Sequence, residues 1–160
     1  MDPSKAKDED VAANMTNLLD TSELFLQTIM DSLPSCPPAF RYMARILRNE
    51  VCSKFPDARY SSVGGFLFLR FFCPAILAPE SCGLALSGTP DAKARRPLIL
   101  IAKVLQNLAN NVRFGGKEAF MAPVNEFIDL HLPRLNDFFD AVVYVDEETA
   151  SEYPPLTNLD

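Results

Sequence analysis

The sequence is poor in the residues that build metal and catalytic centres. His131 is its only histidine, which excludes a histidine-rich metal cage. Its four cysteines, at positions 36, 52, 73 and 82, lack the close-pair spacing of a zinc site. No Gly-x-Ser-x-Gly nucleophile elbow is present. We therefore expect no metal and no cofactor, and a metabolic enzyme is the least favoured class.

Long hydrophobic runs are also missing. The longest, residues 64–69 and 71–77, are divided by Arg70 and fall well short of the ~20 apolar residues that a membrane-spanning helix needs. Residues 1–10 are charged and resemble neither a secretory signal nor a transit peptide. The cysteines lie mostly among apolar neighbours, as reduced thiols do in a cytosolic core. The sequence predicts a cytoplasmic protein without an integral membrane segment.

The remaining composition is that of one folded domain. Of 160 residues, 48% are hydrophobic and 22% charged, which is enough apolar material for a core. The net charge of −6 is concentrated at the two ends, since residues 1–10 carry −2, residues 146–160 carry −5 and the middle carries +1. We expect a flexible segment at 1–10, a helical domain at 11–145 and an acidic tail at 146–160. A nearly neutral body excludes the basic surface of a nucleic-acid binder.

Apolar residues recur at intervals of three and four almost throughout, which predicts an all-α helical bundle. The first helix carries a stripe from Leu18 to Leu33, including Leu24, and ends at Pro34. The second, residues 38–51, has a solvated face of three arginines, Arg41, Arg45 and Arg48. The third, residues 63–72, is apolar nearly all round and is expected to be buried, with Pro74 breaking the chain after it.

The second half of the chain is also helical by pattern. Residues 80–91 read as a loop, and a long helix over residues 92–112 ends before Gly115-Gly116. A short turn follows around Phe120, and residues 124–130 and 133–143 form two more helical stretches.

Two features are candidates for function. Arg70 lies within an apolar segment and needs either a partner or an opening to water; an arginine that extends to the surface near a helix end is an equal alternative. Lys103, Gln106, Asn110 and Arg113 share one face of the long helix. That face could simply be the solvent-exposed side of an amphipathic helix, although such a side more often carries Lys and Glu than the two amides found here.

Several ordered blocks of this sequence resemble the Ras GTPase-activating protein family. They are Phe68-Leu69-Arg70-Phe71-Phe72-Cys73-Pro74-Ala75-Ile76-Leu77-Ala78-Pro79, Ala94-Arg95-Arg96, residues 101–110, and Phe114-Gly115-Gly116-Lys117-Glu118 with Met121. Upstream, Asp2-Pro3-Ser4-Lys5, Asn17-Leu18-Leu19 and Ser35-Cys36-Pro37-Pro38 also resemble that family. The resemblance covers roughly residues 2–145.

The resemblance implies an all-helical domain that binds GTP-loaded Ras-type GTPases. Arg70 corresponds to a secondary arginine that steadies the loop of the catalytic arginine finger, and Leu69 lies beside it at the GTPase-facing groove. Lys103, Gln106, Asn110 and Lys117 correspond to groove residues that contact the GTPase. Recruitment to the inner face of the plasma membrane by partners would fit such a role.

The resemblance is to the C-terminal half of the family's domain. No arginine here is followed by the family's finger-loop pattern, so the chain is either a fragment or a protein that kept the groove without the catalytic arm. We expect a partial GTPase activator that stimulates hydrolysis when combined with a finger. The alternative is a non-catalytic GTPase-binding or scaffold domain. Exposed apolar surface could also support self-association.

Overall fold

The structure, a computed structural model, describes residues 8–84 and 92–153. These residues form helices and connecting turns, with no strand among them, so the predicted all-α fold is confirmed. The predicted flexible segment at 1–10 falls largely outside the described residues, and so does part of the predicted loop at 80–91.

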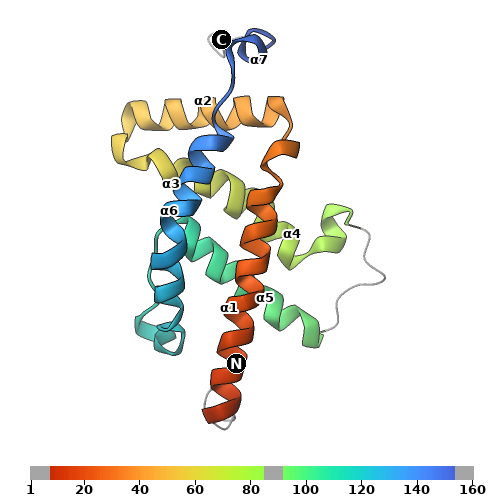
Figure 1. Cartoon of the computed structure of the whole chain (residues 1–160), viewed down its shortest axis with the longest axis vertical. Helices are drawn as coiled ribbons and strands as arrows, with labels where there is room; N and C mark the ends of the chain where they lie inside the picture. The colour runs from red at the N-terminus through yellow and green to blue at the C-terminus, as the bar shows by residue number, and fades with distance from the viewer. Residues whose placement is uncertain (1–7, 85–91, 154–160) are drawn as a thin grey trace.

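Seven α-helices and several shorter helical turns make up the described chain (Figure 1). The α-helices are α1 (Asp8–Asp31), α2 (Pro38–Lys54), α3 (Arg59–Gly64), α4 (Cys73–Leu77), α5 (Ala92–Ala109), α6 (Val124–Val142) and α7 (Glu147–Ser151). The 3-10 turns are η2 (Leu33–Ser35), η3 (Pro56–Ala58), η5 (Pro79–Cys82) and η6 (Gly116–Met121), and η4 (Gly65–Phe72) is a π-helix.

The core lies where α1, α5 and α6 meet the helix built from α3, η4 and α4. In Figure 1, α1 and α6 run along the long axis and α2 crosses one end. The largest fully buried side chains come from all of these central elements: Leu26, Leu67, Phe68, Leu105, Leu108, Ile128, Leu135 and Phe139. In α1 the predicted stripe is wrong at Leu24, which is 65% exposed. Leu26 is buried instead.

Pro74 does not end the third helix, contrary to the expectation from sequence. From Gly65 to Phe72 the chain winds as a π-helix, and the Cys73 N–H bonds to the Phe68 carbonyl, five residues earlier. The wider turn changes the bonding register ahead of Pro74, so the helix continues through α4 to Leu77. The segment is also less buried than expected, because Leu69 and Phe71 are exposed.

The continuous helix Pro56–Leu77 is long and apolar enough, by length and composition alone, to cross a membrane. A core helix of a globular domain has the same properties. This helix lies within the bundle, where Val63, Leu67 and Phe68 are at most 1% exposed. Packing therefore accounts for part of its apolar composition, and the exposed Leu69, Phe71 and Leu77 are not explained by it.

The two helical stretches predicted after residue 123 are a single helix, α6, with Pro133 inside it. Pro133 and Asp129 are both exposed. The carbonyl of Asp129, which loses its helical partner because proline has no N–H, therefore belongs to the solvent side of the helix. A proline on the solvent-exposed side can thus be accommodated within a helix that continues past it.

The sequence predicted a solvated arginine face on α2, but the structure shows these arginines bonded to neighbouring segments. Arg41 donates to the Leu33 carbonyl at 2.6 Å, and Arg45 donates to the Val145 carbonyl at 3.0 Å. Arg48 pairs with Asp140 at 2.6 Å. These three side chains attach α2 to η2, to α6 and to the segment that follows α6, which helps to explain how a helix with only Ala44 buried stays attached.

The acidic segment after residue 145 begins with the short helix α7. Asp146 caps it by accepting a hydrogen bond from the Thr149 N–H at 2.7 Å. Tyr153 stacks on Tyr42 of α2, with ring centroids 5.1 Å apart. The rest of the predicted tail, residues 154–160, lies outside the described part of the chain.

Candidate functional site

The first two candidate residues, Leu69 and Arg70, lie on the π-helix η4 and point away from the core. Leu69 is 43% exposed, and Arg70 is exposed as well. No described residue forms a hydrogen bond or ion pair with the Arg70 side chain. Arg70 thus reaches solvent, as one of the two sequence interpretations required. π-turns within helices are frequent at functional sites.

The polar residues of α5 occupy one side of that helix. Asn110 and Arg113 are exposed and Gln106 is partly exposed, whereas Ile101, Val104, Leu105 and Leu108 on the opposite side are buried. Val112, the last residue of the helix predicted from the sequence, is 49% exposed because α5 ends at Ala109 and Asn111 turns the chain with φ of 52°. The predicted polar face is therefore present at Lys103, Gln106 and Asn110, but the prediction is wrong for Arg113, which follows the turn at Asn111 and lies outside the helix.

Two close contacts show how η4 and α5 cross. A Cβ added to Gly64 would lie 2.7 Å from the Ala109 carbonyl oxygen, and the Cys73 thiol lies 3.5 Å from the Ala102 carbonyl oxygen. The two helices therefore run antiparallel. Gly64 and Cys73 lie on either side of Leu69 in the chain, and Ala102 and Ala109 lie on either side of Gln106. This crossing brings Leu69 to the level of Gln106.

The third part of the site is the turn η6. Lys103 of α5 forms an ion pair with Glu118 of η6, so the start of this turn is attached to the polar side of α5. The backbone of Lys117 belongs to η6, but its side chain lies outside the described residues. Sequence reasoning treated Glu118 only as a neighbour of Lys117 and missed its pairing with Lys103, because a contact between elements leaves no local pattern.

Asn125 is a second residue that the sequence did not single out. Its side-chain amide accepts a hydrogen bond from the Phe114 N–H at 2.8 Å and donates one to the Phe114 carbonyl at 3.0 Å. Arg113 is paired with Asp129 of α6. The connection between α5 and η6 is thus attached to α6 at two adjacent residues.

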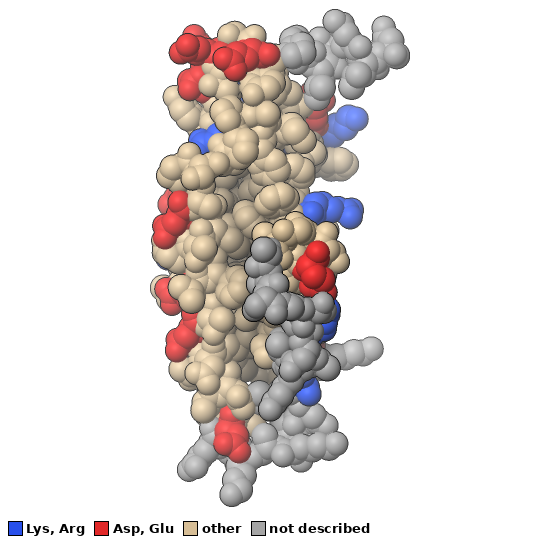
Figure 2. Space-filling view, turned by 90° about the vertical axis from the view of Figure 1, so that its right-hand side faces the viewer, with Lys and Arg blue, Asp and Glu red and all other residues tan. Residues whose placement is uncertain are grey.

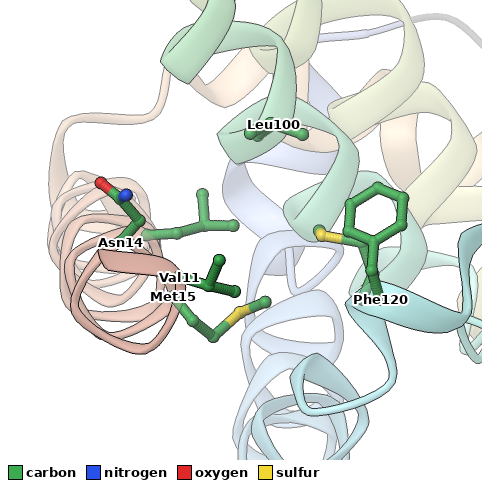
Figure 3. A pocket seen from close by; sticks show the side chains of 7 residues that line it. Val11, Asn14, Met15, Leu100 and Phe120 are labelled. Atoms are coloured by element: carbon green, nitrogen blue, oxygen red, sulfur yellow. The ribbon is translucent and has the colours of Figure 1, made fainter. Parts of the chain in front are cut away.

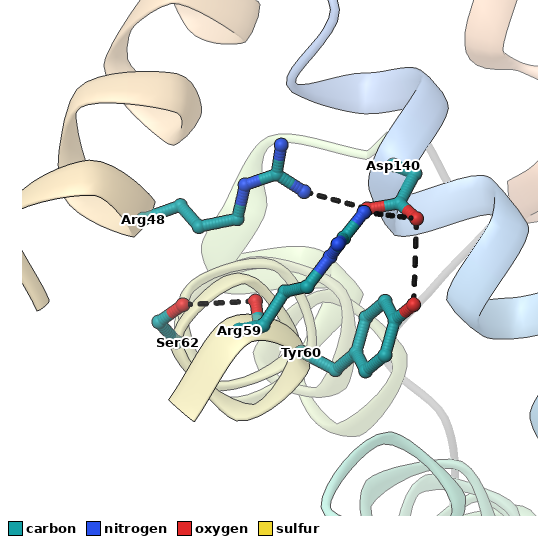
Figure 4. Close-up of polar contacts among 5 residues, drawn as sticks. All are labelled: Arg48, Arg59, Tyr60, Ser62 and Asp140. Atoms are coloured by element: carbon teal, nitrogen blue, oxygen red, sulfur yellow. Dashed lines mark hydrogen bonds and ion pairs between the residues drawn. The ribbon is translucent and has the colours of Figure 1, made fainter. Parts of the chain in front are cut away.

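Away from this face, Asp140 of α6 joins α2 and α3 (Figure 4). It accepts hydrogen bonds from Arg48 at 2.6 Å, from the Arg59 Nη2 at 2.8 Å and from the Tyr60 hydroxyl at 3.4 Å. Partial burial raises the pKa of Asp140, but the hydrogen bonds and charges of Arg59 and Arg48 lower it by more, so that it lies below its usual value. The cluster fixes the start of the helix that carries Leu69 and Arg70.

An apolar pocket of about 190 Å³ lies between α1, α5 and η6. Figure 3 shows Val11 and Met15 of α1 facing Leu100 and Phe120 across it. On the described part of the surface in Figure 2, most basic side chains lie apart from one another along one edge, and they do not form a continuous patch. No group of three or more potential metal ligands occurs among residues 8–84 and 92–153.

The fold is that of an all-helical domain, and comparison with known proteins specifies the family. The family model described as GTPase-activator protein for Ras-like GTPase matches residues 2–110. This chain belongs to that family.

Named relatives agree with the family match. The chain is 41% identical over 147 residues to a probable Ras GTPase-activating-like protein, ngap, of Dictyostelium discoideum, covering 89% of this chain and 17% of that protein. It is 41% identical over 151 residues to human Ras GTPase-activating protein 1, covering 92% of this chain and 14% of that protein. Neurofibromin-A of Dictyostelium discoideum is 36% identical over 141 residues, 86% of this chain and 15% of that protein. The chain therefore spans a small part of the relatives that it matches.

Proposed function

We propose that this chain binds GTP-loaded Ras-type GTPases and contributes to the activation of their GTP hydrolysis when an arginine finger is supplied. The observation that supports the proposal is the exposure of Leu69 and Arg70 on the helix that crosses α5, in a chain of the GTPase-activator family. A surface that combines an exposed apolar side chain with amides and cations offers both apolar area and hydrogen bonds to a partner.

Arg70 and Lys103 have different roles in this proposal. Arg70 has no partner among the described residues, so its guanidinium is available to hold the carbonyl groups of a finger loop. Lys103 is held by Glu118, which limits the rotamers of its side chain before a partner arrives. Gln106, Asn110 and Lys117 complete the contact surface. The finger itself, which accelerates GTP hydrolysis by on the order of 10³ to 10⁵ in known activators, would come from outside these 160 residues.

A second candidate function is binding without catalysis. It is favoured by the absence from this sequence of the family's finger-loop pattern. In that case the same surface would hold a GTPase in its GTP state, or a scaffold partner, without accelerating hydrolysis. The protein would act in the cytoplasm and reach the inner face of the plasma membrane through its partners.

Binding and single-turnover hydrolysis measured together separate the two functions. We expect the chain to bind a Ras-type GTPase more tightly with a non-hydrolysable GTP analogue than with GDP, and to add little to hydrolysis alone. Large acceleration by the chain alone would show that no external finger is needed. Equal affinity for both nucleotide states, or no binding, would contradict the proposal.

Variants of α5 test the surface itself. Gln106→Ala and Asn110→Ala remove polar side chains from a wet helix face, so the free energy of unfolding should change by no more than about 0.5 kcal/mol. Affinity for the GTP-bound GTPase should fall. Asn49→Ala, which removes an exposed asparagine from α2, is the matched control and should leave affinity unchanged. Unaltered binding by both α5 variants would rule out this face.

A further inference from the structure

We propose that Asn125 is a positioning residue for the GTPase-binding loop: its amide fixes the Phe114 backbone and thereby sets where Gly116, Lys117 and Glu118 stand. The inference rests on the proposed function. Asn125 would not touch the GTPase itself, because its side chain is occupied on both sides by Phe114.

One side-chain amide pairs with both backbone polar groups of Phe114, as a residue of a neighbouring strand does in a β-sheet. The Phe114 N–H donates to the Asn125 Oδ1 at 2.8 Å, and the Asn125 Nδ2 donates to the Phe114 carbonyl at 3.0 Å. Both distances are ordinary for strong N–H···O bonds. An amide side chain has a donor and an acceptor two bonds apart and can make both contacts at once, as Asn125 does here.

Phe114 needs this partner because no helix supplies one. Residues 112–115 lie between the end of α5 and the start of η6 and have no regular secondary structure. The Phe114 residue is only 5% exposed. Leaving buried backbone polar groups unpaired raises the free energy of the fold. The pair of hydrogen bonds between Asn125 and Phe114, called the clasp below, therefore selects one conformation of the loop.

The chain after Phe114 is conformationally free unless it is anchored. Gly115 is extended with φ of −177°, and Gly116 adopts a left-handed φ of 54°, so two glycines separate Phe114 from Lys117. The loop is held upstream by Phe114–Asn125 and downstream by Lys103–Glu118. With both anchors in place, the loop is ordered before binding and loses less entropy when a partner docks.

The test is Asn125→Asp, studied as a function of pH. At neutral pH the introduced carboxylate can still accept from the Phe114 N–H, but its second oxygen repels the Phe114 carbonyl. Binding of the GTPase loaded with a non-hydrolysable GTP analogue should be about tenfold weaker than for the unmodified chain. Protonation restores an O–H donor, so affinity relative to the unmodified chain should recover as pH falls from about 7.5 to about 5, since the repulsion raises the carboxyl pKa above its usual value of about 3.9.

Two companion variants make the result specific. Asn125→Ala loses the clasp at every pH and should show the weaker binding without recovery. Asn136→Asp introduces the same charge elsewhere on α6, at a residue without a side-chain hydrogen bond to the described residues, and should behave like the unmodified chain. The charged pair next to the clasp, Arg113 and Asp129, is the same in all variants.

Amide hydrogen exchange provides a readout that needs no GTPase. The Phe114 amide should exchange faster in Asn125→Ala, while amides in the middle of α5 and α6 keep their protection. The inference would be overturned, and the proposed function would not, if Asn125→Asp bound the GTPase with unmodified affinity at neutral pH. The same would follow if its loss of affinity were equal at every pH. Failure of the unmodified chain to bind would overturn the proposed function, and the exchange result would then still report whether the clasp orders the loop.

Discussion

Arg70 illustrates how little an exposed candidate side chain need contribute to folding. Its neighbours in sequence are Leu69 and Phe71, both exposed, so the arginine sits in an apolar but solvent-facing stretch of η4. A charge that keeps its hydration carries no burial penalty, and one without a partner contributes no ion-pair energy. The side chain is therefore free to serve a partner.

Arg70→Met should separate stability from function. We expect the free energy of unfolding to change by less than about 0.5 kcal/mol, measured by urea denaturation, because no described contact is lost. GTPase activation in the presence of a finger-supplying protein should fall. A large loss of stability would mean that Arg70 anchors a network within the fold, and the role in finger support would then have no basis in this chain.

At the scale of elements, the site depends on how closely helices approach. Gly64 has no side chain where α3 crosses α5 and packs on α6, and a Cβ there would meet the Ala109 carbonyl at 2.7 Å and the Phe139 ring at 3.2 Å. The next residue, Gly65, has nothing within 4 Å of the same position. One glycine of the pair is required by packing and the other is not.

Gly64→Ala should destabilise the fold by about 1–3 kcal/mol, since the added methyl forces apart a backbone contact. Gly65→Ala is the matched control and should leave stability unchanged or raise it by up to about 1 kcal/mol, because alanine favours a helix. Thermal melts of the two variants provide the comparison. Equal effects would show that the close approach at Gly64 is not real.

Asp140 makes the attachment of α2 and α3 to α6 dependent on pH. Its pKa in the folded chain lies below the ordinary 3.8, so its contribution is complete above that value and is lost as pH falls through the depressed folded value. Asp140→Asn should lower the free energy of unfolding by about 1 kcal/mol at neutral pH, since the carboxylate is one-third exposed. This difference in stability from the unmodified chain should disappear below about pH 4. Asp137→Asn, at an exposed residue of the same helix, should show no such gap.

Periodicity was sufficient to predict an all-α fold, because helical spacing is a local property, and it also located the polar face of α5. It failed where partners come from distant elements. The arginines of α2 look solvated until Leu33, Val145 and Asp140 are placed beside them. Prolines were overestimated as helix breakers, since the π-turn at η4 and the wet side of α6 accommodate Pro74 and Pro133. Asn125 had no sequence signal at all.

For the molecule as a whole, His131 links stability to pH near neutrality. It lies on α6, 5% exposed, with its ring 4.2 Å from that of Phe127. Burial lowers its pKa below the ordinary 6.5; Glu23 on α1 opposes this shift and Arg134 on α6 adds to it. The neutral imidazole is thus the form that fits between the helices.

The sign of the pH effect is set by that lowered pKa. The unfolded chain binds a proton at its histidine below about pH 6.5, whereas the folded chain does so only at lower pH, so stability should fall between these two values as the solution is acidified. The slope cannot exceed about 1.4 kcal/mol per pH unit for one group. His131→Leu removes this titration and should flatten the profile in that window, whatever its effect on absolute stability. Urea midpoints measured at several pH values supply the comparison, and parallel profiles for the two proteins would show that His131 is solvated and not buried between α1 and α6.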